Sequence, residues 1–196
     1  LTENKNLPLF NRAISGTYPP GSTIKMIGAA AALQEGVVTE NTVITDNGNL
    51  VISNQYNPSI KYNFYGWKRS GLGPMTVKSA IAESSDIFFY TVAGGHPTSK
   101  INGLGAEKLT QYYRKFGMGA VTGLDIQGEK PGLVADPAWK AKYFEDDPIS
   151  SKWFLGDTYH ISIGQGDMLA TPLQVAVWTG AIANNGTLHK PHLLKE

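Results

Sequence analysis

The sequence predicts an α+β fold in which helices dominate and the β structure is short. Runs of helix-forming residues follow Ser22, Pro74 and Thr171. Between the first two runs lie short β-prone pieces on either side of the asparagine-glycine pair at 47–48, which is a strong turn signal. No internal repeat or low-complexity tract divides the 196 residues, so a single domain over residues 1–196 is expected.

Composition narrows the class of protein. Hydrophobic residues make up 41% of the chain, which fits a globular domain with a core. The net charge of +1, from 17 Lys and Arg against 16 Asp and Glu, argues against binding of nucleic acid or an anionic membrane through bulk charge. No apolar run approaches the roughly 20 residues of a membrane span, so any anchor or export segment is expected outside these residues. The absence of cysteine excludes disulfides and thiolate metal sites.

The first expected helix covers residues 22–35. Two prolines at 19 and 20 forbid helix and favour an extended approach to Ser22. The run that follows is rich in alanine and isoleucine, and Gly36 supplies a left-handed stop. We expect this helix to be largely buried, with Ser22 at its N-terminus.

The middle of the chain predicts a small hairpin and then two helices. Residues 37–73 are expected to form a hairpin turning at Asp46-Asn47-Gly48, with irregular loops beside it. Residues 74–93 read as two helices, the first capped by Thr76, that meet at a polar corner, Ser84-Ser85-Asp86. An ordinary explanation of this corner is a helix break at which Asp86 caps the second helix.

The C-terminal half predicts two clear helices separated by a turn-rich region. Residues 106–116 place apolar side chains on one helical face, at Leu109, Tyr112, Tyr113 and Phe116. Within the turn-rich residues 117–160 we expect short strands at 123–126 and 132–134, and one helical turn opened by Asp136-Pro137. A last helix opens at Thr171-Pro172 and closes at Asn184-Asn185-Gly186.

The sharpest chemical feature is Ser22-Thr23-Ile24-Lys25. Residues three apart share a helical face, so the Lys25 amine can lie beside the Ser22 hydroxyl. A lysine whose pKa is lowered by burial can take the serine proton and create a nucleophile. The ordinary alternative is that Ser22 is an N-cap and Lys25 a solvated residue of the first turn.

The context favours the chemical interpretation. Ser-x-x-Lys is one of the motifs that penicillin-binding proteins and related β-lactamases share, and the wider string RAISGTYPPGSTIK resembles class B penicillin-binding proteins. The corner at 84–86, followed by IFFY, is similar to that family's second motif, in its serine-any-aspartate form. That form, with the later strings TGLDIQGEKPGLVADPAWK, GDTYHISIGQG and ATPLQ, most resembles the elongation-type penicillin-binding protein 2 group.

This resemblance implies the transpeptidase and serine β-lactamase-like fold and assigns roles to residues. Ser22 falls on the nucleophile and Lys25 on the general base. Ser84 falls on the second-motif serine, which relays a proton, and Asp86 on its polar partner. Gln165 and Gly166 fall near the site and are expected to contact substrate.

The implied activity is peptidoglycan D,D-transpeptidation through an acyl-serine, on stem peptides ending in D-Ala-D-Ala, with β-lactams acylating the same serine. Cell-wall elongation proteins including a glycosyltransferase are the implied partners, at the extracytoplasmic face of a bacterial membrane in the periplasm. No metal is expected, because the four histidines read as loop residues, and no nucleic acid partner is expected, because the net charge is only +1. No cofactor is expected. The alternative is a non-catalytic scaffold of the same machinery, since fold does not imply activity.

The family's third motif, lysine-threonine-glycine or lysine-serine-glycine, has no counterpart among these residues. We therefore expect this chain to be a partial transpeptidase domain, with most of the central antiparallel sheet outside it. Apolar helix faces, above all that of residues 22–35, are expected to be uncovered. The chain on its own is expected to be inactive.

Overall fold

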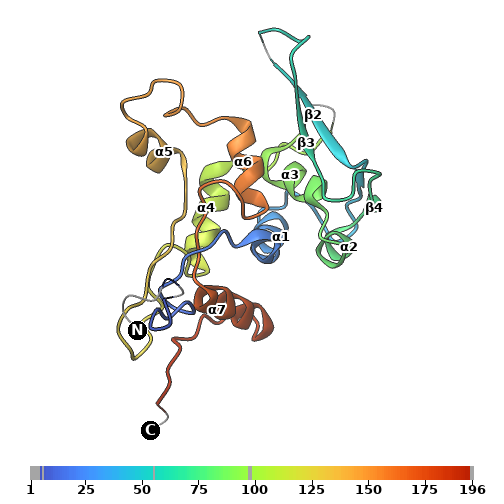
Figure 1. Cartoon of the computed structure of the whole chain (residues 1–196). Helices are drawn as coiled ribbons and strands as arrows, with labels where there is room; N and C mark the ends of the chain where they lie inside the picture. The colour runs from blue at the N-terminus through green and yellow to red at the C-terminus, as the bar shows by residue number, and fades with distance from the viewer. Residues whose placement is uncertain (1–4, 6, 55, 97–98, 195–196) are drawn as a thin grey trace.

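A computed structural model describes residues 5, 7–54, 56–96 and 99–194. Helix α1 (Lys25–Gln34) lies at the centre, in contact with α2 (Val77–Ala82), α3 (Asp86–Gly94) and α4 (Ala106–Lys115) (Figure 1). Its small side chains allow this close approach, because a helix surface of alanine and glycine brings neighbouring helices near its backbone. Gly28, for example, faces the ring of Phe89 on α3. The expected α+β fold, rich in helix with short strands, is confirmed.

The helix expected from residue 22 is built in two parts. A 3-10 turn, η1 (Gly21–Ile24), precedes α1, so Ser22 lies one turn before the α-helix begins. The expectation that one face of this helix would be uncovered holds in part, because Met26 and Ala30 are only partly buried and Leu33 is exposed along one side. The other side is covered. Ile24 and Ile27 are fully buried, and large exposed side chains begin only at Leu33 in the last turn. Helices α2, α3 and α4 provide this cover.

The strands form two separate antiparallel pairs. Strand β1 (Ile44–Asp46) pairs with β4 (Gly73–Met75), and β2 (Asn49–Ser53) pairs with β3 (Lys61–Tyr65). The predicted hairpin across Asn47-Gly48 is therefore wrong, because the strands before and after this turn belong to different sheets. Gly48 has a φ of +82°, and a Cβ there would lie 2.1 Å from the carbonyl oxygen of Arg69. The turn is fixed by this long-range contact, which local sequence does not reveal.

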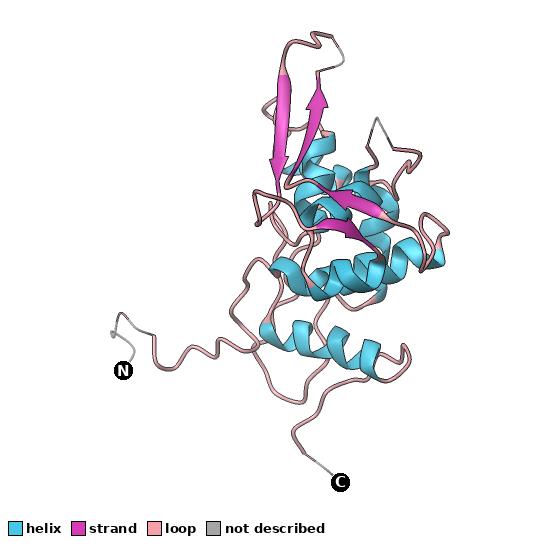
Figure 2. Ribbon diagram, turned by 90° about the vertical axis from the view of Figure 1, so that its right-hand side faces the viewer, coloured by secondary structure: helices cyan, strands magenta, loops and turns pink. Residues whose placement is uncertain are grey.

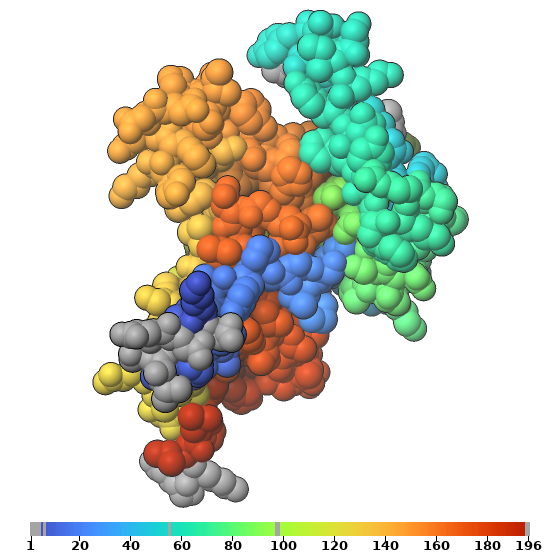
Figure 3. All heavy atoms as spheres, in the orientation of Figure 1, coloured from blue at the N-terminus to red at the C-terminus, as the bar shows by residue number. Residues whose placement is uncertain are grey.

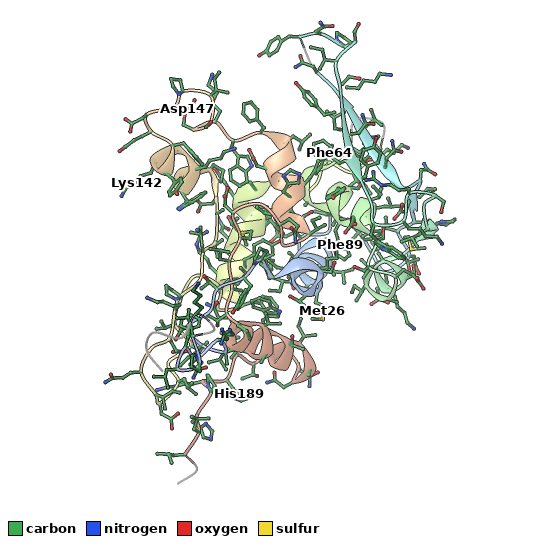
Figure 4. The ribbon with its side chains drawn as sticks, in the orientation of Figure 1. Met26, Phe64, Phe89, Lys142, Asp147 and His189 are labelled. Carbon is green, nitrogen blue, oxygen red and sulfur yellow. The ribbon has the colours of Figure 1, made fainter. Side chains whose placement is uncertain are left out.

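The β2–β3 hairpin stands out from the helical body as an arm (Figure 2). Leu50 and Phe64 are partners in its register and lie on its inner face. The Phe64 ring packs edge-on against Tyr90 of α3 and Tyr159 of α6 (Leu155–Ser162) where the arm meets the helices (Figure 4). The base of the arm is thereby anchored in the core.

The corner between α2 and α3 forms as expected, with one correction. Thr76 caps α2 by accepting a hydrogen bond from the backbone N–H of Ser79. Helix α3 is capped by Ser85, whose hydroxyl accepts from the N–H of Phe88 at 3.1 Å. The interpretation of Asp86 as the cap is wrong, because Asp86 is the first residue inside α3. Its carboxylate is thus available for other contacts.

The C-terminal half contains more helix than expected. Helices α4 and α7 (Pro172–Ala183) match the predictions, whereas α5 (Pro137–Tyr143) is longer than the single turn foreseen and α6 was missed. The strands expected at 123–126 and 132–134 are absent from these described segments, where Leu133 makes only an isolated bridge with Leu169. None of the helices in the described part of the chain has the length and apolar character that a membrane crossing requires.

Candidate active site

Two elements far apart in sequence meet at Ser22. The 3-10 turn η1 presents Ser22 at the surface, and the α2–α3 corner places Ser84 against it. The Ser84 hydroxyl donates a hydrogen bond to Ser22 Oγ at 2.9 Å. The structure thus brings together the two serines that the sequence singled out.

Lys25 lies behind these serines in the protein interior. Its side chain is 2% exposed. Its Nζ donates to the Ser84 carbonyl oxygen at 2.9 Å, to Ser84 Oγ at 3.0 Å and to Asp86 Oδ1 at 2.5 Å. Among the described residues no hydrogen bond joins Ser22 directly to Lys25. Ser84 Oγ stands between them, so the polar atoms form a row from Ser22 through Ser84 and Lys25 to Asp86.

The backbone of Ser84 is held in an unusual conformation. Its φ is +53°, in the left-handed region that non-glycine residues seldom adopt. This conformation lets both the carbonyl and the hydroxyl of Ser84 point at Lys25 Nζ. Such outliers persist where surrounding contacts determine the backbone, and they concentrate at functional sites.

Asp86 is fixed on its other side by a residue that sequence reasoning did not single out. Its Oδ2 accepts the backbone N–H of Trp67 at 2.9 Å. The Trp67 indole N–H donates to the carbonyl oxygen of Glu83 at 3.1 Å. The segment that follows β3 therefore closes over the α2–α3 corner. A backbone donor carries no side-chain signature, so no motif could have located this contact.

Asp46 is a second buried carboxylate beside the corner, and it too was missed. Only 3% of Asp46 is exposed. Its Oδ2 accepts the Ser85 hydroxyl at 2.6 Å, and its Oδ1 accepts the N–H of Gly48 at 2.8 Å. Asp46 thus ties the β1–β2 turn to the residue between Ser84 and Asp86. Sequence reasoning had assigned Asp46 only to a tight turn.

Burial dominates the acid-base behaviour of the lysine. Desolvation lowers the pKa of the Lys25 amine below its usual value of 10.5. The hydrogen bond and negative charge of Asp86, and the more distant charge of Asp46, oppose this shift and favour the charged form. The net effect is a lower pKa of the Lys25 amine, so more of the amine is neutral near pH 7, as a general base requires.

The predicted loop at 164–166 reaches the same turn from α6. The carbonyl oxygen of Gly164 accepts the N–H of Gly21 at 3.0 Å, so the loop lies directly against the residue before Ser22. Gln165 is exposed, with its Nε2 3.9 Å from where a Cβ on Gly21 would be. Gly166 is exposed one residue further on. The structure therefore places Gln165 near the turn that carries Ser22, whereas a Cβ on Gly166 would face His160.

Acidic and histidine side chains that could form a metal site are dispersed. Across the described ranges, no group of three or more His, Cys, Asp or Glu side chains has the proximity needed to hold an ion. His189 lies in the segment after α7 (Figure 4), and His192 follows in the same segment. The prediction that the histidines are loop residues is wrong for His160, which lies in α6. The groups that the structure joins by hydrogen bonds at the corner are the hydroxyls of Ser22 and Ser84, the amine of Lys25 and the carboxylate of Asp86.

Hydrogen bonds thus join a serine, a buried lysine and a second serine, the residues that the Ser-x-x-Lys and serine-any-aspartate motifs singled out. Residues 2–196 match the family described as "Penicillin binding protein transpeptidase domain". The chain belongs to this family. The match confirms the resemblance that the sequence motifs indicated.

Individual relatives narrow the resemblance to the penicillin-binding protein 2 group. The chain is 39% identical over 195 residues to "Peptidoglycan D,D-transpeptidase MrdA" of Acinetobacter baumannii, covering 100% of this chain and 26% of that protein. The structure of Pseudomonas aeruginosa PBP2 in complex with WCK 5153 superposes with a TM-score of 0.86 at 36% identity, over 100% of this chain and 40% of that one. Helicobacter pylori PBP2, in complex with MreC, gives a TM-score of 0.80 at 36% identity, over 98% and 32%.

These alignments also define the extent of the match. The chain spans 26–28% of the length of curated relatives such as the Acinetobacter baumannii and Escherichia coli proteins. The likeness therefore describes a transpeptidase-domain segment that resembles penicillin-binding protein 2.

Proposed function

We propose that this chain supplies the acylating centre of a peptidoglycan D,D-transpeptidase, with Ser22 as nucleophile. The observation that carries the proposal is the row of hydrogen bonds from Ser22 Oγ through Ser84 Oγ to Lys25 Nζ, at 2.9 and 3.0 Å. A row of this kind lets an exposed hydroxyl exchange a proton with a buried amine. Lys25 can thus remain desolvated while Ser22 meets substrate.

The proposed substrate is a stem peptide ending in D-Ala-D-Ala. Ser22 Oγ bonds to the carbonyl carbon of the penultimate D-Ala, and its proton passes through Ser84 to the neutral Lys25 amine. When the tetrahedral intermediate collapses, the bond to the terminal D-Ala nitrogen breaks. The proton held by Lys25 returns through Ser84 to that leaving amine. An acyl-serine remains, and an amine from a neighbouring strand then displaces Ser22.

The other groups of the site have supporting roles in this proposal. Asp86 holds Lys25 and, through Trp67 N–H, fixes the segment that follows β3. Asp46 holds Ser85 and thereby the corner. Gln165 lies beside the turn of Ser22, and in this proposal its amide would donate to or accept from the substrate backbone. β-Lactams, which resemble the terminal dipeptide, would acylate Ser22 in the same way.

The setting of the whole protein is proposed from its relatives. Helicobacter pylori PBP2 forms a complex with MreC. By analogy, the protein that carries this chain would act within cell-wall elongation machinery that includes a glycosyltransferase. It would work at the extracytoplasmic face of a bacterial membrane, in the periplasm, held there by an anchor outside residues 1–196.

Covalent labelling tests the assignment of Ser22. In the natural protein that carries this chain, a fluorescent penicillin should label the protein, and Ser22→Ala should abolish the label. Lys25→Ala should slow labelling by a factor on the order of 100 to 10,000, the usual worth of a positioned general base. Ser15→Ala, outside the site, is the control and should label normally. Absence of label from the unmodified, folded protein would reject the enzyme proposal in favour of a scaffold.

A further inference from the structure

We propose that the β2–β3 arm, here residues 49–69, is a docking surface for the uncross-linked peptidoglycan strand whose stem peptide reaches Ser22. This inference rests on the proposed function and adds a polymer-binding surface outside the reacting centre. Three observations carry it: the side chains exposed on the arm, their charge, and the continuity of the arm with the site.

Exposed aromatic side chains are concentrated on the arm. Across the described residues six Tyr and Trp side chains are exposed, and four of them fall within residues 56–67: Tyr56, Tyr62, Tyr65 and Trp67. The arm projects away from the helical body, so these rings meet solvent rather than a core (Figure 3). Tyrosine and tryptophan are enriched at recognition surfaces because they offer broad contact area with few rotatable bonds. Flat rings also suit the apolar faces of sugar rings.

The arm has a single sign of charge. Residues 49–69 include three of the 17 Lys and Arg and none of the 16 Asp and Glu. On the outer face of β3, Lys61 and Tyr65 alternate with the inward-facing Phe64, and all three cations of the arm are exposed. An un-cross-linked strand carries free carboxylates on its stem peptides. Such a strand is the occupant that this charge complements.

Arg69 and Tyr65 form a preorganised pair. The Arg69 guanidinium carbon lies 3.8 Å from the centre of the Tyr65 ring, which fixes a planar cation against an aromatic face. A guanidinium held in this way presents its remaining donors to a carboxylate in a two-pronged geometry. The pair therefore offers a place for a ring and a carboxylate side by side.

The arm is continuous with the candidate active site. Trp67, two residues after Tyr65, donates its backbone N–H to Asp86 Oδ2, and its indole N–H bonds to the carbonyl oxygen of Glu83. Glu83 immediately precedes Ser84. A strand lying on the arm is thereby adjacent to the corner that holds Ser84 and Lys25. This continuity favours substrate over an unrelated partner as the occupant.

The test compares matched double variants of the natural protein. Tyr65→Ala/Arg69→Gln removes the ring and the cation from the arm. Tyr143→Ala/Lys142→Gln makes the same chemical change on α5, where both side chains are exposed, on the other side of the molecule from the arm (Figure 4). Sedimentation with labelled, soluble, un-cross-linked peptidoglycan strands measures binding. We expect about tenfold weaker binding for the arm variant and unchanged binding for the α5 variant.

Further measurements separate this inference from the proposed function. Penicillin is too small to span the arm, so its labelling of Ser22 should be equal in both double variants, which also shows that both are folded. Strands stripped of stem peptides should bind with less dependence on salt, because they lack the carboxylates. If the arm variant binds strands as tightly as the unmodified protein does, the docking proposal is overturned. The same result is expected if the arm binds another protein instead of a strand. Loss of penicillin labelling in the unmodified protein would reject the transpeptidase assignment independently of strand binding.

Discussion

Lys25 Nζ lies 2.5 Å from Asp86 Oδ1, and the two side chains are only 2% and 11% exposed. Burial of a lysine favours its neutral form, whereas this carboxylate favours its charged form. Burial and the carboxylate therefore shift the protonation equilibrium of the Lys25 amine in opposite directions. Ser84 Oγ is hydrogen-bonded to both Lys25 Nζ and Ser22 Oγ, so it connects the amine to Ser22.

Removing one partner of this buried pair should destabilise the protein strongly. Asp86→Ala leaves the ammonium of Lys25 buried without its carboxylate, for which a loss of about 3–5 kcal/mol in unfolding free energy is typical. Asp86→Asn keeps one acceptor oxygen for Lys25 but places an NH2 group at the other position, and it should lose less than Asp86→Ala. The matched control is Lys108→Ala, which breaks an exposed ion pair with Glu35 and should change stability little. Urea unfolding followed by circular dichroism measures all three, and equal losses for Asp86→Ala and Lys108→Ala would contradict the role of Asp86.

The pH dependence of acylation should report on Lys25. Because burial lowers the pKa of its amine, the acylation rate should rise with pH through an apparent pKa below 10.5. Asp46→Asn removes a negative charge that raises the pKa of Lys25, so the rise should move to lower pH. Asp147→Asn, in the exposed loop before α6, is the control and should leave the profile in place. The measurement is the rate of penicillin acylation against pH, and a shift to higher pH in Asp46→Asn would contradict the account.

Two glycines of the 164–166 loop provide a matched test of how the nucleophile is positioned. Gly164 and Gly166 have φ values of +69° and +73°, so alanine costs similar backbone strain at both. A Cβ on Gly164 would lie 2.3 Å from the carbonyl oxygen of Gly21, whereas one on Gly166 meets nothing closer than 3.5 Å. Gly164→Ala should therefore displace the turn of Ser22 and slow penicillin labelling at least tenfold more than Gly166→Ala does. Equal rates for the two variants, each checked for folding, would show that this contact does not position Ser22.

Sequence reasoning located the residues of the candidate site because their polar side chains lie close together in the sequence. Ser22 and Lys25 share one turn, and Ser84 and Asp86 share one corner, so local patterns and family resemblance sufficed. The contact between the two pairs follows from the packing of α1 against α3. Ser84 bridges Ser22 and Lys25 with its backbone in the left-handed region, at a φ of +53°. The sequence patterns did not predict this conformation.

The helices with capping residues at their ends were predicted well, as at Thr76 and Thr171. The strands were predicted less well, because pairing joins distant residues. Asn47-Gly48 is a strong hairpin signal, yet β1 pairs with β4 across the whole arm. Helix α6 was missed because no conventional capping residue precedes it: Phe154 occupies the N-cap position, and the Asp157 side chain accepts the N–H of Phe154.

The central claim is that Ser22 reaches its base through Ser84. The most direct test is the acylation rate constant in a double-mutant cycle of Ser84→Gly and Lys25→Ala, where glycine tolerates the left-handed backbone at 84. Each single variant should acylate about 100 to 10,000 times more slowly than the unmodified protein. The double variant should be no slower than the slower single one, because both substitutions break one proton path. If Ser84→Gly acylates at the rate of the unmodified protein, Lys25 reaches Ser22 without Ser84 and the account is contradicted.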